Sequence, residues 1–324
     1  MPSWEFETRR NHRALSALIA RVTSWDFPRG CSTFILGVAV VYLIAGLAAL
    51  AAWRLTGDTA WVEEFFRSPG AVALVCLAAL ELFFSIQVFR EFSSGQPLGM
   101  AWKLIAISAA GDLMGAILVQ ILGVRWHINP LRYFSVWPSI EVESLRNLGL
   151  IVGGTFRYAL LAAAFYRALQ VYRKSGFLSR LKMVDWCILA LASGYVVREA
   201  RDLILALLAG KRPAAVEVMG WPVDPLLVIL LAESMLLFRS AQKMGKGWIG
   251  RCWRAFSVGV GFIVAGDVAL WATNYGFLPW PWSAVGWYMW IPAAALFAAA
   301  PAYQLEAIFL ARGREARSRR SFLP

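Results

Sequence analysis

The sequence predicts an all-α fold, a polytopic membrane helical bundle with about eight transmembrane helices. Of its 324 residues, 59% are hydrophobic and only 16% are charged, and the mean hydropathy is +0.58. Soluble globular domains have a far more polar composition. Hydrocarbon offers no partners for backbone polar groups, so a chain must cross it as helices or as a closed barrel. The apolar runs here are too long for barrel strands, which leaves helices.

Apolar windows of about 20 residues define the predicted spans in chain order. They cover residues 32–53, 71–89, 101–123, 147–170, 183–210, 224–240, 255–276 and 284–310. Before the first span, apolar side chains recur at helical spacing with arginines elsewhere on the wheel, which predicts an interfacial amphipathic helix. We therefore divide the chain into a cytoplasmic amphipathic segment at 1–31, a single transmembrane domain at 32–311 and a basic cytoplasmic tail at 312–324.

The distribution of basic residues predicts the orientation. The segments on one side of the predicted spans carry 22 Lys and Arg residues, whereas those on the other side carry 7. The positive-inside rule then places both termini in the cytoplasm, in a cell inner membrane. The net charge of +12 is thus mostly topological. It favours the anionic lipids of the inner leaflet as partners, and we expect no nucleic-acid binding. Partner membrane subunits remain a hypothesis.

A weak internal repeat supports a further hypothesis about the architecture. Residues 86–102 (IQVFREFSSGQPLGMAW) and 169–186 (LQVYRKSGFLSRLKMVDW) share Gln-Val-aromatic-Arg followed by a distant Trp, and residues 241–253 keep only the Gln and the Trp. The bundle would then consist of three related helical hairpins flanked by single spans. Ionisable residues recur at a spacing of 76 in the first helices of these hairpins, at Glu81, Arg157 and Glu233.

Four charged residues fall inside the fifth predicted span: Arg198, Glu199, Arg201 and Asp202. At 100° per residue they occupy about 160° of arc, and Arg198 and Asp202 have the i, i+4 spacing of a helical ion pair. A charge at the bilayer centre costs about 2.5–3.5 kcal/mol on insertion scales. We therefore expect these side chains to turn away from lipid and to be paired.

Other predicted spans also contain ionisable residues near their middles, at Glu81, Asp112, Arg157, Glu233 and Asp267. Three interpretations stay open. The charges fix the register of packed helices, they line a cavity that binds a polar solute, ion or proton, or the fifth span's arginines extend to the outer interface. In the cavity interpretation, the substrate-binding residues are Arg157, Arg198, Arg201 and Asp202. The ion or proton relay then consists of Glu81, Asp112, Glu233 and Asp267.

Small residues accompany two of these acids. Gly111 and Gly115 form a GxxxG pattern around Asp112, and Gly266 precedes Asp267. Such glycines are typical of close helix crossings, and the alternative is that each Gly-Asp pair makes room for a cation.

Short motifs of enzyme chemistry are absent from the sequence. There are two histidines and four scattered cysteines, and no phosphate-binding loop, nucleophile elbow or HExxH motif occurs. We therefore expect no metal and no cofactor, and we assign no catalytic residues.

Transport or sensing of a small polar solute or ion is the function that the sequence favours. The alternative is a non-catalytic scaffold or accessory subunit of a membrane complex. The third hypothesis is a lipid-linked membrane enzyme, although the absence of motifs weighs against enzyme activity.

Overall fold

The computed structural model describes most of the chain between residues 30 and 321. The described ranges are 30–65, 69–92, 95–126, 144–145, 147–149, 151–210, 221–244, 247–274, 277–278 and 282–321. The chain divides between Cys31 and Ser32, and the unit described below is Ser32–Pro324. The predicted amphipathic helix within residues 1–31 lies almost wholly outside the described residues.

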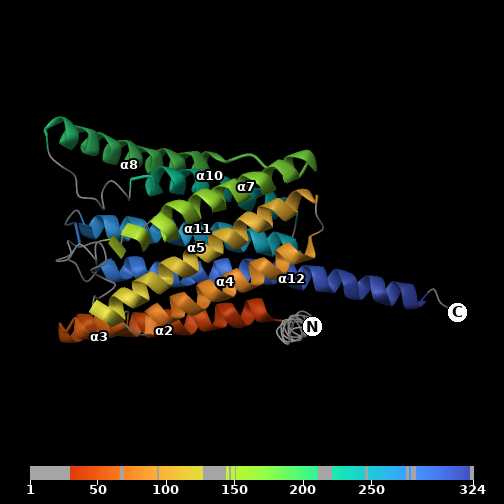
Figure 1. The fold of residues 1–324 in the computed structure, drawn as a ribbon, viewed down its shortest axis with the longest axis horizontal. Helices are drawn as coiled ribbons and strands as arrows, with labels where there is room; N and C mark the ends of the chain where they lie inside the picture. The colour runs from red at the N-terminus through yellow and green to blue at the C-terminus, as the bar shows by residue number, and fades with distance from the viewer. Residues whose placement is uncertain are drawn as a thin grey trace, which may run out of the picture. The chain divides into compact units, whose positions relative to one another are not determined.

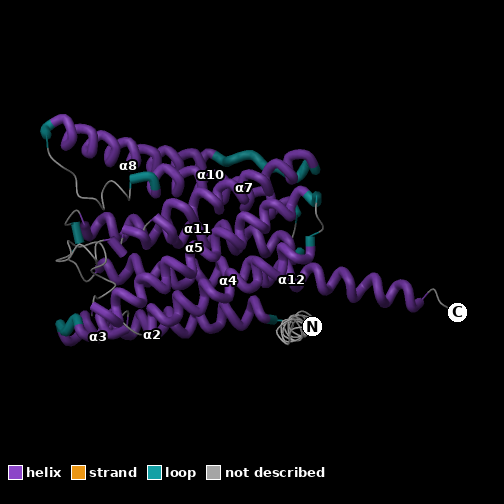
Figure 2. The backbone as a smooth tube through the Cα atoms, in the orientation of Figure 1, coloured by secondary structure: helices purple, strands orange, loops and turns teal. Residues whose placement is uncertain are grey.

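All regular structure in the described ranges is helical, as Figure 2 shows. The elements are α2 (Cys31–Thr56), α3 (Ala60–Phe65), α4 (Ala71–Glu91), α5 (Pro97–Trp126), η3 (Ile151–Phe156), α7 (Arg157–Lys174), α8 (Met183–Leu208), α10 (Val223–Lys243), α11 (Trp248–Asn274) and α12 (Ser283–Ser321). Each predicted span overlaps a long helix, and the prediction of a helical bundle is confirmed. The short helix α3 was not predicted.

Six helical segments are long and apolar enough to cross a membrane, among the residues that were described. They lie in α2, α4, α5, the segment that contains η3 and α7, α11 and α12. This length and composition are those of a multi-pass membrane protein. The two other long helices, α8 and α10, are not among the six, so the count of eight spans stays a prediction. Figure 1 shows α8 at one edge of the bundle and α2 at the other.

Fully buried aromatic side chains from four helices form the centre of the core. Trp102 of α5 lies 6.0 Å from Trp253 of α11, measured between ring centroids. Phe256 of α11 lies 5.6 Å from Phe165 of α7 and 5.7 Å from Phe297 of α12. Because aromatic rings bury a large apolar area and prefer defined mutual geometries, this cluster fixes how α5, α7, α11 and α12 pack.

The residues of the repeat motif have unlike environments. Trp102 and Trp253 are buried and pack together, whereas Trp186 is exposed on α8. The hypothesis of three related hairpins therefore stays a prediction.

Polar contacts fasten the ends of two peripheral helices. At the start of α2, the Glu306 carboxylate accepts a hydrogen bond from the Ser32 backbone N–H at 3.3 Å and another from its hydroxyl at 3.1 Å. At the start of α8, Arg239 of α10 donates two hydrogen bonds to Asp185, at 2.8 and 3.1 Å. These bonds lower the pKa of the Asp185 carboxyl, which lies outside the six candidate spans. A bidentate pair of this kind fixes both position and orientation.

A close helix crossing joins α11 and α12 through two glycines. A Cβ built on Gly266 would lie 2.9 Å from the Gly286 carbonyl oxygen and 2.6 Å from the Trp290 indole nitrogen. A Cβ on Gly286 would in turn lie 2.9 Å from the Gly266 carbonyl oxygen. Only residues without a side chain permit this approach, which is how helices pack closely inside membranes.

Replacing Gly266 with Ala should destabilise the bundle, because the added methyl group meets backbone that cannot move aside. We expect a loss of about 1–3 kcal/mol, seen as a lower midpoint of thermal unfolding in detergent. Gly261→Ala is the matched control, since it lies on the same helix with no neighbour within 4 Å of its Cβ position. Equal midpoints for the two variants would contradict the crossing.

Candidate functional site

Three charged side chains from neighbouring helices meet inside the bundle. Arg157 of α7 places Nη1 2.7 Å from Oδ1 of Asp112 on α5, and its Nη2 lies 3.6 Å from Oε2 of Glu81 on α4. The Glu81 side chain is only 1% exposed and that of Arg157 10%. We call Glu81, Asp112 and Arg157 the interior network. It joins three of the eight residues that the sequence predicted as site residues.

The close approach of α5 to η3 positions the arginine. A Cβ built on Gly111 would lie 3.0 Å from the Val152 carbonyl oxygen, and one on Gly115 would lie 3.0 Å from the Gly153 Cα. The expected crossing at these glycines is therefore present. The π-helical turn of η3 ends immediately before Arg157, and such turns are frequent at functional sites.

Two further contacts hold Arg157 in place. The Ser108 hydroxyl on α5 donates a hydrogen bond of 3.0 Å to the backbone carbonyl of Arg157. The guanidinium carbon lies 5.1 Å from the ring centroid of Phe297 on α12, within the range of a cation–π contact. The arginine is thus enclosed by α4, α5 and α12.

Several polar atoms around the network make no hydrogen bond of ordinary geometry with the described residues, although the Glu81 and Asp112 carboxyls interact with each other. They are both carboxylate oxygens of Glu81, the hydroxyl of Ser85 and Nε of Arg157. Ser85 is fully buried and follows Glu81 by one helical turn, so the two lie on the same face of α4. Buried polar atoms in native proteins are nearly always bonded to protein or water. Several such atoms lie close together here, so the site is suited to binding a small polar molecule or ion.

The charges of the network do not balance. Arg157 makes its short contact with Asp112, and its distance to Glu81 is longer than a hydrogen bond. Two carboxylates beside one guanidinium leave one negative charge when all three groups are ionised. Because an uncompensated charge is costly in a buried site, a proton or a small cation is needed to balance it.

Three acids on other helices lie within electrostatic range of the network or of one another. The carboxyl groups of Asp112, of Asp267 on α11 and of Asp224 on α10 interact electrostatically with the buried hydroxyl of Tyr158. Asp224 in turn interacts with both Asp267 and Glu199 of α8. Their ionisable side chains belong to α7, α11, α10 and α8.

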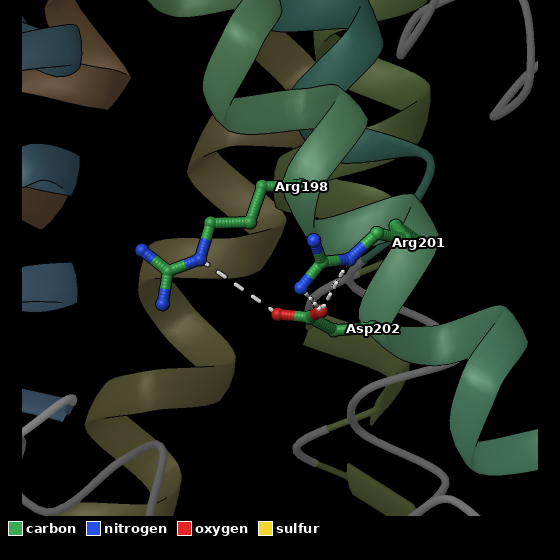
Figure 3. A network of polar contacts seen from close by, with 3 residues as sticks. All are labelled: Arg198, Arg201 and Asp202. Atoms are coloured by element: carbon green, nitrogen blue, oxygen red, sulfur yellow. Dashed lines mark hydrogen bonds and ion pairs between the residues drawn. The ribbon is translucent and has the colours of Figure 1, made fainter.

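The other predicted site residues lie elsewhere. Glu233 is on α10, where its Oε2 is buried without a hydrogen bond from any described residue. Arg198, Arg201 and Asp202 lie on α8, and Figure 3 shows the two guanidinium groups approaching the Asp202 carboxylate. Arg201 bonds it at 3.0 Å, and Arg198 Nε lies 3.7 Å away. Their side chains are 69% and 45% exposed.

Sequence reasoning missed three members of this region: Ser85, Tyr158 and Asp224. Ser85 could have been found from its i+4 spacing to Glu81, and Tyr158 from its position beside Arg157. Asp224 stands at the edge of a predicted span, where an acid usually faces water, so the sequence carried no clear signal for it.

Comparison with protein-family models, curated proteins and solved structures found no match to this chain. In the described ranges, no group of three or more His, Cys, Asp or Glu side chains is arranged to hold a metal ion.

Removing the arginine should destabilise the bundle more than removing the whole network. Arg157→Leu leaves two buried carboxylates without their cation, and we expect a loss of about 3–5 kcal/mol at neutral pH. The triple variant with Leu at positions 81, 112 and 157 buries no unpaired charge and should recover much of this loss. Thermal unfolding in detergent measures both effects. An Arg157→Leu protein as stable as the wild type would show that the ion pairs are not structural.

Proposed function

We propose that this chain is a multi-pass protein of a cell inner membrane, with both termini in the cytoplasm, that moves or senses a small ion. The interior network is its binding site, and the proton is the first candidate for the ion. The sequence also favours a small polar solute. Such a molecule would bind the polar atoms of the network that make no hydrogen bond of ordinary geometry with the described residues.

The burial of Glu81 is the observation that carries this proposal. Its carboxylate is the most deeply buried charged group of the network, and its neighbours among the described residues are the Arg157 guanidinium, 3.6 Å away, and the carboxyl of Asp112, a second acid. A purely structural carboxylate would be expected to use its lone pairs, since unmet polar atoms cost stability. Intramembrane ionisable residues with this character often mark ion and proton pathways.

The chemistry of the site suits reversible binding. A proton on Glu81 balances the charge of the network and turns one oxygen into a donor, with the Ser85 hydroxyl one helical turn away on the same face of α4. Release of the proton strengthens the attraction of Glu81 for Arg157, whose guanidinium is already shared with Asp112. The position of Arg157 would therefore respond to the occupancy of Glu81.

Neighbouring ionisable groups support a route to the site. Tyr158 and Asp267, Asp267 and Asp224, and Asp224 and Glu199 each lie within electrostatic range of one another, and the four residues belong to α7, α11, α10 and α8. Glu81 is almost fully buried, whereas Asp267, Asp224 and Glu199 are half-buried. Partly accessible carboxylates beside a buried acid are what a proton relay through water requires.

Proton flux into liposomes tests the proposal. Purified protein is reconstituted into vesicles that contain a pH-sensitive dye, and a potassium diffusion potential drives proton entry. We expect flux above that of empty vesicles, reduced at least tenfold by Glu81→Gln and by Asp112→Asn. Asp58→Asn, an acid-to-amide change at an exposed position, is the control and should retain the flux.

Labelled sodium serves as the second probe in the same vesicles. Sodium uptake with the same dependence on Glu81 would identify sodium as the ion instead of the proton. Flux of both ions no greater than in empty vesicles, or flux unchanged by Glu81→Gln, would contradict movement of either ion through the network.

A further inference from the structure

Helix α11 carries an acid directly beside its close crossing with α12. Asp267 follows Gly266, whose missing side chain lets α12 approach. A Cβ built on Gly266 would lie 2.6 Å from the indole nitrogen of Trp290 and 2.8 Å from the adjoining ring carbon. Because the glycine leaves this space open, the indole N–H of α12 reaches the backbone turn of α11 from which the Asp267 side chain extends.

The indole N–H of Trp290 and the carboxyl of Asp267 are suited to each other. The indole nitrogen is buried and makes no hydrogen bond of ordinary geometry with a described residue. The Asp267 carboxyl is nevertheless close enough to interact with it. A buried tryptophan usually finds an acceptor for its N–H, and an ionised carboxylate can only accept. A small rotation of the Asp267 side chain therefore completes a bond that satisfies both groups.

The other neighbours of Asp267 supply no positive charge. They are the carboxyl of Asp224 and the hydroxyl of Tyr158, which interact with it electrostatically. Among the described residues, no ion pair includes Asp267. An ionised carboxylate inside a membrane bundle needs a donor or a cation. Trp290 is the donor that the structure offers it.

The environment of Trp290 differs from that of a membrane anchor. Tryptophans of the aromatic belt keep the polar end of the indole ring at the level of the lipid headgroups. The indole nitrogen of Trp290 is instead covered by protein. Its ring lies 4.8 Å from that of Trp287, between centroids, in an edge-to-face contact that fixes its orientation.

The pair of Asp267 and Trp290 lies between the interior network and one end of the bundle. Asp267 is three residues from the end of the apolar segment of α11, and Trp290 is six residues from the start of that of α12. Glu81, by contrast, is at the middle of α4. Tyr158, which follows Arg157 in the chain, is within electrostatic range of Asp267. Asp267 is thus placed to receive an ion from this end of the bundle.

We propose that Trp290 is a positioning residue, whose indole N–H donates a hydrogen bond to the Asp267 carboxylate and holds it as the entry group for protons bound for the interior network. A charge-assisted hydrogen bond of this kind stabilises the carboxylate without neutralising it, so Asp267 stays able to take up a proton. The hydrogen bond follows from the packing of α11 and α12, whereas the entry role rests on the proposed function.

Indole N–H resonances test the hydrogen bond. The protein is labelled with 15N-tryptophan and studied in detergent, where the Trp290 resonance is the one missing from Trp290→Phe. We expect this resonance to shift as the pH is raised, and the shift to disappear in Asp267→Asn. If Trp290→Phe does not fold, Asp267→Asn alone identifies the resonance by its lost pH dependence. Indole resonances with the same pH dependence in the wild type and in Asp267→Asn would overturn the hydrogen bond.

Proton flux in liposomes tests the entry role. We expect Trp290→Phe to lower the flux at least threefold. Trp287→Phe, the same change on the same helix, is the matched control and should retain it. Because Trp290 acts through the acid, Trp290→Phe combined with Asp267→Asn should conduct no less than Asp267→Asn alone.

The outcomes separate this inference from the proposed function. Flux that is normal in Trp290→Phe, equally lowered in Trp287→Phe, or lower in the double variant than in Asp267→Asn would overturn the positioning role. A wild-type protein without flux would contradict both the proposed function and the entry role, and the resonance test of the hydrogen bond would still stand.

Discussion

The contact of Arg157 with Asp112 and Glu81 is the constraint on which the rest of the structure depends. It ties α4, α5 and α7 together in a setting where apolar side chains gain little from packing against each other instead of lipid. One guanidinium serves two carboxylates, with a 2.7 Å contact to Asp112 and a longer one of 3.6 Å to Glu81. The arrangement that joins the helices therefore leaves the negative charge of Glu81 only partly compensated. The same three side chains stabilise the bundle and form the proposed binding site.

Small and aromatic residues have different roles in the packing around this contact. Glycines bring α5 against η3 and α11 against α12, so that backbones touch where side chains would prevent it. The buried rings of Trp102, Trp253 and Phe256 fill the space between the helices at the centre of the core. Phe297 belongs to both arrangements, since it packs on Phe256 and also faces the guanidinium of Arg157.

Much of the fold was predictable from the sequence because length and hydropathy alone specify membrane helices. Glu81, Asp112 and Arg157 were recognisable as buried charges, but the sequence could not show that they meet, since helix rotation and neighbour choice depend on tertiary packing. The charged residues of α8 show the same limit of prediction from sequence. Their common face was predicted from helical spacing, whereas the structure alone shows that α8 presents Arg201 outward and Leu189 inward.

The central claim is that Glu81 carries an exchangeable proton in the folded protein, and infrared spectroscopy of the protein in sodium-free lipid membranes tests it most directly. The account predicts a stretching band from a buried protonated carboxyl group that disappears as the pH is raised and is missing in Glu81→Gln. A band of undiminished intensity in Glu81→Gln, or no such band in the wild type at any pH, would contradict it.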